Sequence, residues 1–340
     1  MKYKTLFYLY ILIAACSTAN AQTARKAAAI KRMTDSLTME GLSAYAMRYP
    51  QLRQAFFATD FIGKANVKGE LNGKDLYEGK MNITRIRSNF NVPISNWGRN
   101  VVTGTIGYQQ QQLKTTEITS YDPRFSNADR STTKSTVSLS ATFGRSDSVF
   151  NKLIFYGLGI SGVTDELSSI KRLNYIGSIS MPIRRDQNSS LTIGLVVILD
   201  PSAIVPAVPI VSYWHKYKNP NVELFVDFPS RIVLRKQFSK RSWATAGSEL
   251  GGSLLFFNLD KPSLPQNNIY TNAEVRTGLT FEYLATKKLV LGVSGGLYST
   301  TASRMFDRND KPDDYFFKAK TGSAPYLTFS VSFLPFLKRL

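Results

Sequence analysis

The stretch Asn-Ala-Glu-Val-Arg-Thr-Gly-Leu-Thr-Phe-Glu-Tyr, residues 272–283, alternates apolar and polar side chains with a period of two. Ala273, Val275, Leu279 and Phe281 share one parity, and only Thr277 interrupts that side. Such alternation is typical of a β-strand with one apolar and one polar face. The run exceeds the usual globular strand of about five or six residues. It matches the roughly 9–11 residues that a tilted membrane-spanning strand needs.

The same pattern recurs at residues 136–143, 173–181 and 327–333. A long sandwich strand explains one such run well and many of them poorly. The most apolar later stretch, residues 193–211, contains Asp200 and three prolines, which exclude a membrane-spanning helix. Only helices and closed barrels satisfy every backbone group in lipid. The sequence therefore predicts an all-β fold, a closed antiparallel up-and-down transmembrane β-barrel.

Turn signals divide the chain into about fourteen strands, with twelve as the alternative. The weakest pair is 222–228 and 231–238, which could fuse into one strand. With fourteen strands, every long loop falls on one side and both termini fall on the other, as in outer-membrane barrels. The predicted strands are 60–71, 76–92, 100–113, 132–144, 150–163, 172–183, 190–200, 207–217, 222–228, 231–238, 242–257, 270–284, 288–300 and 324–336.

The N-terminus has the features of an export signal. Lys2 and Lys4 precede an apolar run, and Ala19-Asn20-Ala21 offers small residues where a signal peptidase cuts. Cleavage after Ala21 gives a signal peptide at 1–21, and lipoprotein processing at Cys16 is the alternative. Residues 22–58 lack the period of two, which predicts a periplasmic segment with a short helix or a disordered tether. The barrel is then expected at 59–340, in the outer membrane of a Gram-negative cell envelope.

Aromatic residues near predicted strand ends fit the girdles that barrels place at both membrane interfaces. Individually, each of them could also be an ordinary core residue. They are Trp97, Tyr108, Tyr156, Tyr213, Trp214, Phe228, Trp243, Phe256 and Tyr298.

The same parity places acids and bases in the interior. If Val222 and Leu224 face lipid, Glu223 faces inward, and four consecutive strands contribute charges of both signs. Arg or Lys on the lipid face would cost about 2–4 kcal/mol at the membrane midplane, which favours this parity. The set is either a cross-strand charge ladder filling a narrow lumen or a polar constriction that selects what passes. Its members are Glu223, Asp227, Arg231, Arg235, Glu249, Glu274, Arg276 and Glu282.

Little in the sequence indicates catalysis. The chain has one His and one Cys, and no recognisable nucleophile, metal or phosphate-loop motif, so we expect no catalytic residue, metal site or cofactor. His215 could act only as the base of a lipid-modifying site. The formal charge of +19 is spread over turns and loops rather than gathered in a block, which argues against nucleic acid. Outer-membrane lipid, lipopolysaccharide and the barrel-assembly machinery are the expected partners, and the oligomeric state stays open.

Four stretches resemble a Bacteroidetes-type outer-membrane β-barrel family of unknown function. They are Ala-Asn-Ala-Gln at 19–22, Asn-Val-Pro-Ile at 91–94, the proline-punctuated block from Asp200 to Ile210, and Val-Glu-Leu-Phe-Val-Asp-Phe-Pro at 222–229. The resemblance covers most of residues 50–336 and implies the barrel fold, without an activity to carry over. The chain departs from the usual aromatic end of such barrels, because Leu-Lys-Arg-Leu at 337–340 follows Phe336.

These observations predict a non-catalytic barrel that is a narrow passive channel or a structural surface barrel. The first alternative is an adhesion or ligand-binding barrel that uses loops 114–131 and 301–323. It predicts ordered aromatic contacts from Tyr121, Phe125, Tyr315 and Phe316, together with a sealed lumen. The second is a barrel-embedded lipid-modifying enzyme, which needs His215 within hydrogen-bond reach of a Ser or Asn.

Overall fold

The computed structural model describes residues 37–123, 125–166, 168–199, 206–218, 221–259 and 263–337. The chain divides into two compact units, one of residues up to Arg53 with Leu334–Phe336 and one holding the remainder. The first unit contains an α-helix at 37–48 and the short 3₁₀-helix η1 (Pro50–Leu52). No helix among the described residues is long and apolar enough to cross a membrane. The predicted signal peptide, Cys16 and residues 22–36 of the predicted N-terminal segment lie outside the described residues.

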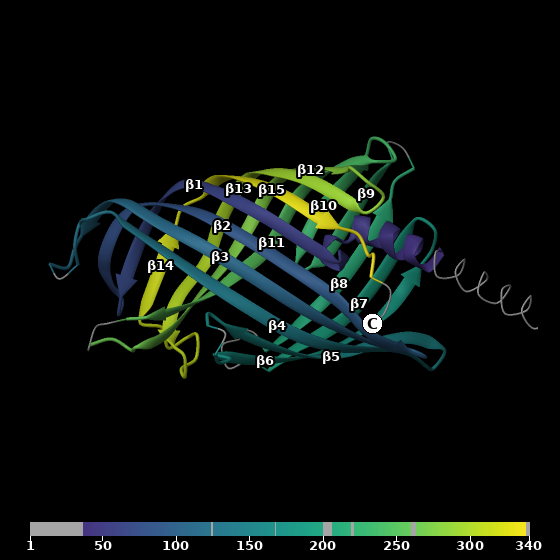
Figure 1. Cartoon of the computed structure of the whole chain (residues 1–340), viewed down its shortest axis with the longest axis horizontal. Coiled ribbons are helices and arrows are strands. Elements are labelled where there is room, and N and C mark those ends of the chain that lie inside the picture. The colour runs from purple at the N-terminus through teal and green to yellow at the C-terminus, as the bar shows by residue number, and fades with distance from the viewer. Residues whose placement is uncertain are drawn as a thin grey trace, which may run out of the picture. The chain divides into compact units, whose positions relative to one another are not determined.

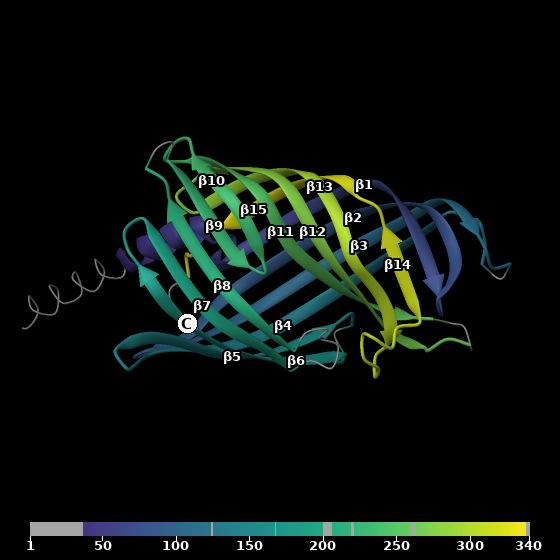
Figure 2. The same ribbon diagram turned by 180° about the vertical axis from the view of Figure 1, so that it is seen from behind.

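The second unit is a single antiparallel sheet closed on itself (Figures 1 and 2). From β1 to β14 each strand pairs with the next one in the chain, and β15 pairs with β13 and β1 to close the ring. The strands are β1 (Ala55–Leu71), β2 (Lys74–Trp97), β3 (Asn100–Ser120), β4 (Arg130–Val149), β5 (Lys152–Thr164), β6 (Arg172–Arg185), β7 (Ser189–Leu199), β8 (Ala207–Lys216), β9 (Val222–Phe228), β10 (Arg231–Gln237), β11 (Ser242–Asn258), β12 (Asn267–Leu284), β13 (Leu289–Asp307), β14 (Phe317–Thr321) and β15 (Ala324–Phe333).

The predicted fourteen-strand barrel is confirmed, since β14 and β15 are two parts of the last strand. β14 lies between β1 and β13 at the loop end, and β15 lies between the same two strands nearer the short turns. The weakest predicted pair forms the separate strands β9 and β10, so the twelve-strand alternative is wrong. Both ends of the barrel sequence meet at the side of the short turns, where Ala55 lies opposite Phe333.

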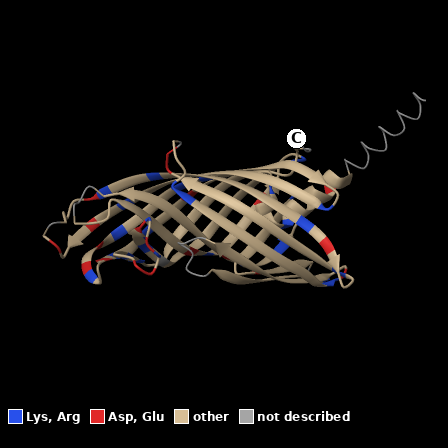
Figure 3. Cartoon of the chain, turned by 90° about the horizontal axis from the view of Figure 1, so that it is seen from below, with Lys and Arg blue, Asp and Glu red and all other residues tan. Residues whose placement is uncertain are grey.

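The barrel wall is apolar outside, as lipid requires. Along β5, Leu158 and Ile160 are exposed, while the intervening positions carry Gly and Ser. Charged residues gather toward the two ends of the strands, and the middle of the wall carries few (Figure 3). Large exposed side chains that follow this outward parity include Phe57, Phe61, Leu139, Ile179, Leu195, Leu279, Phe281, Leu327 and Phe329. The alternation therefore makes a transmembrane β-barrel.

The predicted aromatic set divides between the two faces of the wall. Trp97, Tyr108, Tyr156 and Phe228 are exposed and suit an interface. The interior contains Trp243, Phe256 and Tyr298, which are at most 2% exposed and are therefore ordinary core residues rather than members of an interfacial girdle.

The interior narrows toward the long loops because β10 is short. β10 begins at its turn opposite Glu249, and β11 continues beyond that point without it. Farther along, the Thr136 hydroxyl of β4 donates a hydrogen bond of 2.9 Å to the Leu254 carbonyl of β11. At the loop end, the interior is thus enclosed by β1–β4 and β11–β14, which reach beyond β7–β10 (Figures 1 and 2).

Candidate functional site: a loop-end chamber above a buried charge cluster

The predicted charge ladder separates into distinct groups along the interior. Glu274 and Arg276 of β12 lie midway, and Arg276 donates a hydrogen bond of 2.6 Å to Glu274. Asp60 of β1 with Arg85 and Arg87 of β2 completes this group. We call these five residues the waist cluster.

The waist cluster joins strands that are not neighbours. Arg85 donates two parallel hydrogen bonds, of 2.8 and 2.9 Å, to Glu274, although β1, β13 and β15 separate β2 from β12. Arg87 binds Asp60 with the same two-point geometry, at 2.8 Å for both bonds. The side chains of Arg85, Glu274 and Asp60 are each only 1% exposed. Charges so far from water persist only when they are paired and hydrogen-bonded, which this geometry provides.

Neutral donors satisfy the remaining carboxylate oxygens. The Tyr298 hydroxyl donates to Glu274 at 2.9 Å, and the Thr328 hydroxyl donates to Asp60 at 2.9 Å. Asn272 donates to the Tyr298 oxygen at 3.0 Å. These partners come from β12, β13 and β15, so the cluster fixes several strands at one level of the interior.

A second group lies nearer the short turns. Arg235 donates to Glu223 at 2.8 Å, and its guanidinium lies 4.9 Å from the centre of the Trp243 ring. The Trp243 indole N–H donates to Glu282 at 2.6 Å. Four of the predicted strands thus contribute to one buried arrangement that includes an aromatic residue from β11.

The last predicted residues fall on β9–β11. Arg231 donates to Asp227 at 2.7 Å, and the Ser212 hydroxyl donates to the same carboxylate at 2.6 Å. Glu249 lies opposite Arg231 and Arg276 in the strand register but is exposed, with no ion pair among the described residues. The charges therefore form three paired groups and one free carboxylate rather than one continuous ladder.

Sequence reasoning missed Asp60, Arg85 and Arg87. Asp60 is the first residue of its predicted strand, where no preceding alternation shows whether the side chain faces inward or outward. In Thr84-Arg85-Ile86-Arg87, apolar and charged residues do alternate, and this signal could have assigned both arginines to the interior. The pairing of Arg85 with Glu274 of β12 could not be found, because that contact crosses the barrel.

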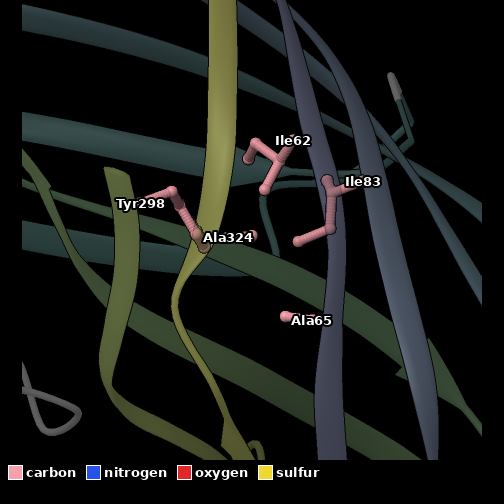
Figure 4. Close-up of a cluster of buried hydrophobic side chains, with 5 residues drawn as sticks. All are labelled: Ile62, Ala65, Ile83, Tyr298 and Ala324. Atoms are coloured by element: carbon pink, nitrogen blue, oxygen red, sulfur yellow. The ribbon is translucent and has the colours of Figure 1, made fainter. Parts of the chain in front are cut away.

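An apolar layer covers the waist cluster on its loop side. Ile62, Ala65, Ile83, Tyr298 and Ala324 pack together there from β1, β2, β13 and β15 (Figure 4). Along β2, Ile83 stands two residues before Arg85 and two after Met81, so the layer separates the charges from the space above.

Above this layer is a cavity of about 530 Å³, which we call the loop-end chamber. Its walls come from β1–β4 and β11–β14, and its rim includes residues of three loops. The lining is mostly apolar and aromatic, with a few polar groups. Representative lining residues are Val67, Tyr77, Met81, Leu113, Phe257, Tyr270, Met305, Phe316 and Phe317.

The four loop aromatics predicted for a binding barrel behave differently from one another. Phe125 stacks on Tyr77 with ring centres 5.2 Å apart, and both line the chamber. Phe316 also lines it. Tyr315 lies under the Arg304 guanidinium at 4.9 Å, outside the lining. Tyr121 is 50% exposed and does not line the chamber.

His215 lies on the outer face of β8, since Ser212 of the opposite parity binds Asp227 inside. Its ring stacks on Tyr213 at 6.2 Å and meets Tyr217 edge-on at 4.6 Å. Within the described part of the chain, no Ser or Asn side chain hydrogen-bonds it. This aromatic setting fits an interfacial residue and gives the lipid-modifying alternative no support.

No protein-family model and no curated protein sequence matches the chain. Among solved structures, it is similar to an outer membrane channel from Pseudomonas putida F1, with 8% identity, 83% and 96% of the two chains covered and a TM-score of 0.35. A Pseudomonas aeruginosa FadL homologue gives 8% identity, 82% and 90% coverage and a TM-score of 0.39. The translocator domain of the autotransporter NalP from Neisseria meningitidis gives 10% identity, 82% and 87% coverage of the two chains and a TM-score of 0.26. At these values the likeness does not extend to ligand or mechanism.

Proposed function

We propose that the protein is a non-catalytic outer-membrane barrel that captures a small, mostly apolar molecule in the loop-end chamber. The observation that carries this proposal is the chamber itself, an apolar cavity of about 530 Å³ above a closed, charged waist. Ligand sites are concave, mainly apolar cavities of about 300–1,000 Å³ with a few polar groups, and the chamber has these properties.

The lining supports binding by burial of apolar surface. Leu113, Tyr270 and Met305 approach from β3, β12 and β13, so a bound molecule would contact several walls at once. Each CH₂ group moved from water into such surroundings contributes about 0.8 kcal/mol, or roughly a fourfold gain in affinity. Affinity in a homologous series should therefore rise steeply until the chamber is full.

The waist cluster supports a closed interior rather than a free passage. A passive channel at this level needs water beside Arg85 and Glu274, whose side chains are each 1% exposed. Separating this pair would leave the buried Arg85 guanidinium without its carboxylate, at a cost of about 3–5 kcal/mol. A narrow passive channel, the main expectation from the sequence, would thus require the waist cluster to rearrange.

The cellular setting is part of the proposal. The apolar outer wall and the export signal expected at residues 1–21 support the outer membrane, with the long loops outside. Lipopolysaccharide and the assembly machinery are then the partners that any such barrel meets. The resemblance to Bacteroidetes-type barrels belongs to the same proposal and assigns no activity.

Binding of a neutral aromatic compound tests the proposal. The protein in neutral-lipid nanodiscs would be dialysed against 2-naphthalenemethanol, with empty nanodiscs measuring partition into lipid. We expect saturable binding that Ala319→Phe weakens roughly tenfold or more, because Ala319 lines the chamber and the added ring would displace about two CH₂ contacts of about 0.8 kcal/mol each. Ala141→Phe on the exposed outer face of β4 is the matched control and should bind as wild type does. Partition equal to that of empty nanodiscs would refute the proposal.

A further inference from the structure

The loop-end chamber is apolar, yet two cations line one of its walls. Arg130 and Lys134 belong to β4 and have the same parity, so both side chains are on the chamber side. Among the described lining residues, Asp122 is the single carboxylate. The lining thus has an excess of positive charge inside a largely apolar space, where an anion gains most from electrostatic attraction.

The guanidinium of Arg130 stacks on an aromatic ring, and its N–H donors have no partner among the described residues. Its guanidinium carbon lies 3.9 Å from the centre of the Phe125 ring, and Phe125 in turn stacks on Tyr77. Stacking occupies the flat face of a guanidinium, while its N–H donors point outward in the plane. The described residues give Arg130 neither an ion pair nor a side-chain hydrogen bond, so those donors remain available to a ligand.

Lys134 lies deeper and is also without an acidic partner. Its ammonium nitrogen is 4.8 Å from the centre of the Phe257 ring, and the residue is half-buried. No ion pair or side-chain hydrogen bond of Lys134 occurs in the described part of the structure. Four residues of extended strand place its Cα about 13 Å from that of Arg130. One cation therefore stands at the rim of the chamber and the other within it.

We infer that the loop-end chamber selects an anionic amphiphile, an apolar body that ends in a carboxylate. This inference rests on the proposed function and names the class of ligand for the same site. The carboxylate meets Arg130 at the rim and comes to rest against Lys134, while the apolar body fills the space between Leu113, Tyr270 and Met305. An ammonium-bearing analogue would face two like charges and be rejected.

The test compares three compounds that share one ring system: 2-naphthoate, neutral 2-naphthalenemethanol and the cation 2-naphthylmethylammonium. Hydrogen bonds to charged groups contribute about 1.5–3 kcal/mol, so 2-naphthoate should bind about ten- to a hundredfold more tightly than the alcohol. The cation should bind more weakly than the alcohol. Equilibrium dialysis of the wild-type protein in neutral-lipid nanodiscs decides this without any substitution.

Single substitutions then show which residue causes the preference for the carboxylate over the alcohol. Lys134→Gln should abolish most of the carboxylate preference, measured as the ratio of the affinities for 2-naphthoate and for the alcohol. Saturable binding of the alcohol by the same variant shows that it is folded. Arg130→Gln should slow association of 2-naphthoate with a smaller loss of affinity. Lys152→Gln removes an exposed lysine at the short-turn end of β5 and should behave as wild type.

Two results would overturn the inference. If 2-naphthoate and the alcohol bind equally well, the two cations only brace Phe125 and Phe257, and the chamber is a neutral apolar site as first proposed. If Lys152→Gln lowers the preference as much as Lys134→Gln, the attraction is a property of the whole charged surface. Failure of all three compounds to bind would instead refute the proposed function itself.

Discussion

Replacing Glu274 with Gln tests whether the waist cluster holds the barrel together. Glu274→Gln keeps the size of the side chain but leaves the Arg85 guanidinium without its carboxylate. In the folded protein this carboxylate accepts bonds of 2.8 and 2.9 Å from Arg85, 2.6 Å from Arg276 and 2.9 Å from Tyr298. Removing one partner of a buried ion pair costs about 3–5 kcal/mol.

The assay is guanidinium unfolding of the refolded barrel in lipid vesicles, followed by tryptophan fluorescence. With a denaturant slope of roughly 4 kcal/mol/M, the midpoint should fall by about 1 M. Glu249→Gln is the matched control, because Glu249 is exposed and has no ion pair among the described residues. Its effect should stay within about 0.5 kcal/mol, as for ordinary surface substitutions. Equal midpoints for Glu274→Gln and Glu249→Gln would refute the reasoning.

Three further predictions concern other parts of the barrel. Trp243→Phe removes the N–H that donates to Glu282 at 2.6 Å, and we expect a loss of about 1–3 kcal/mol in the same unfolding assay. Hydrogen bonds from Ser189 and then Arg184 lower the pKa of Asp186, in the turn between β6 and β7, to about 2. Because the folded pKa is depressed, the ionised carboxylate stabilises this turn at pH above about 4, and this contribution is lost between about pH 4 and 2. Resistance of the turn to an acid-stable protease should therefore fall over that range in the wild-type protein. In Asp186→Asn this pH dependence should be absent. In planar bilayers the folded wild-type protein should give no steady conductance, and stable open channels would contradict a closed waist.

The barrel could be predicted from sequence because a membrane imposes a period of two on every strand. Residues 173–181 and 272–283 show this period, and β6 and β12 cover them. The loop-side ends could not be placed as well. β3 continues to Ser120 and β4 begins at Arg130, because strands that rise above the lipid carry polar residues on both faces and lose the alternation.

The chamber and the waist cluster depend on contacts that no local pattern encodes. The parity of β12 correctly turns Glu274 inward, but its partner Arg85 is 189 positions away in the chain. Closure of the loop end requires β4 to meet β11 at Thr136 and Leu254, which follows from the early end of β10 rather than from either strand's sequence. Phe125 and Phe316 could be nominated as loop aromatics, whereas the cavity they share with Met81 and Tyr270 appears only in three dimensions.

A diffraction experiment on the protein with 6-bromo-2-naphthoate tests the central claim most directly, because bromine can be located by its anomalous signal. We predict a peak inside the loop-end chamber between Leu113 and Met305, with the carboxylate density next to Lys134. The waist cluster should remain paired beneath the bound molecule. Bromine found only on the lipid-facing wall, or below the waist cluster in the barrel interior, would contradict the account.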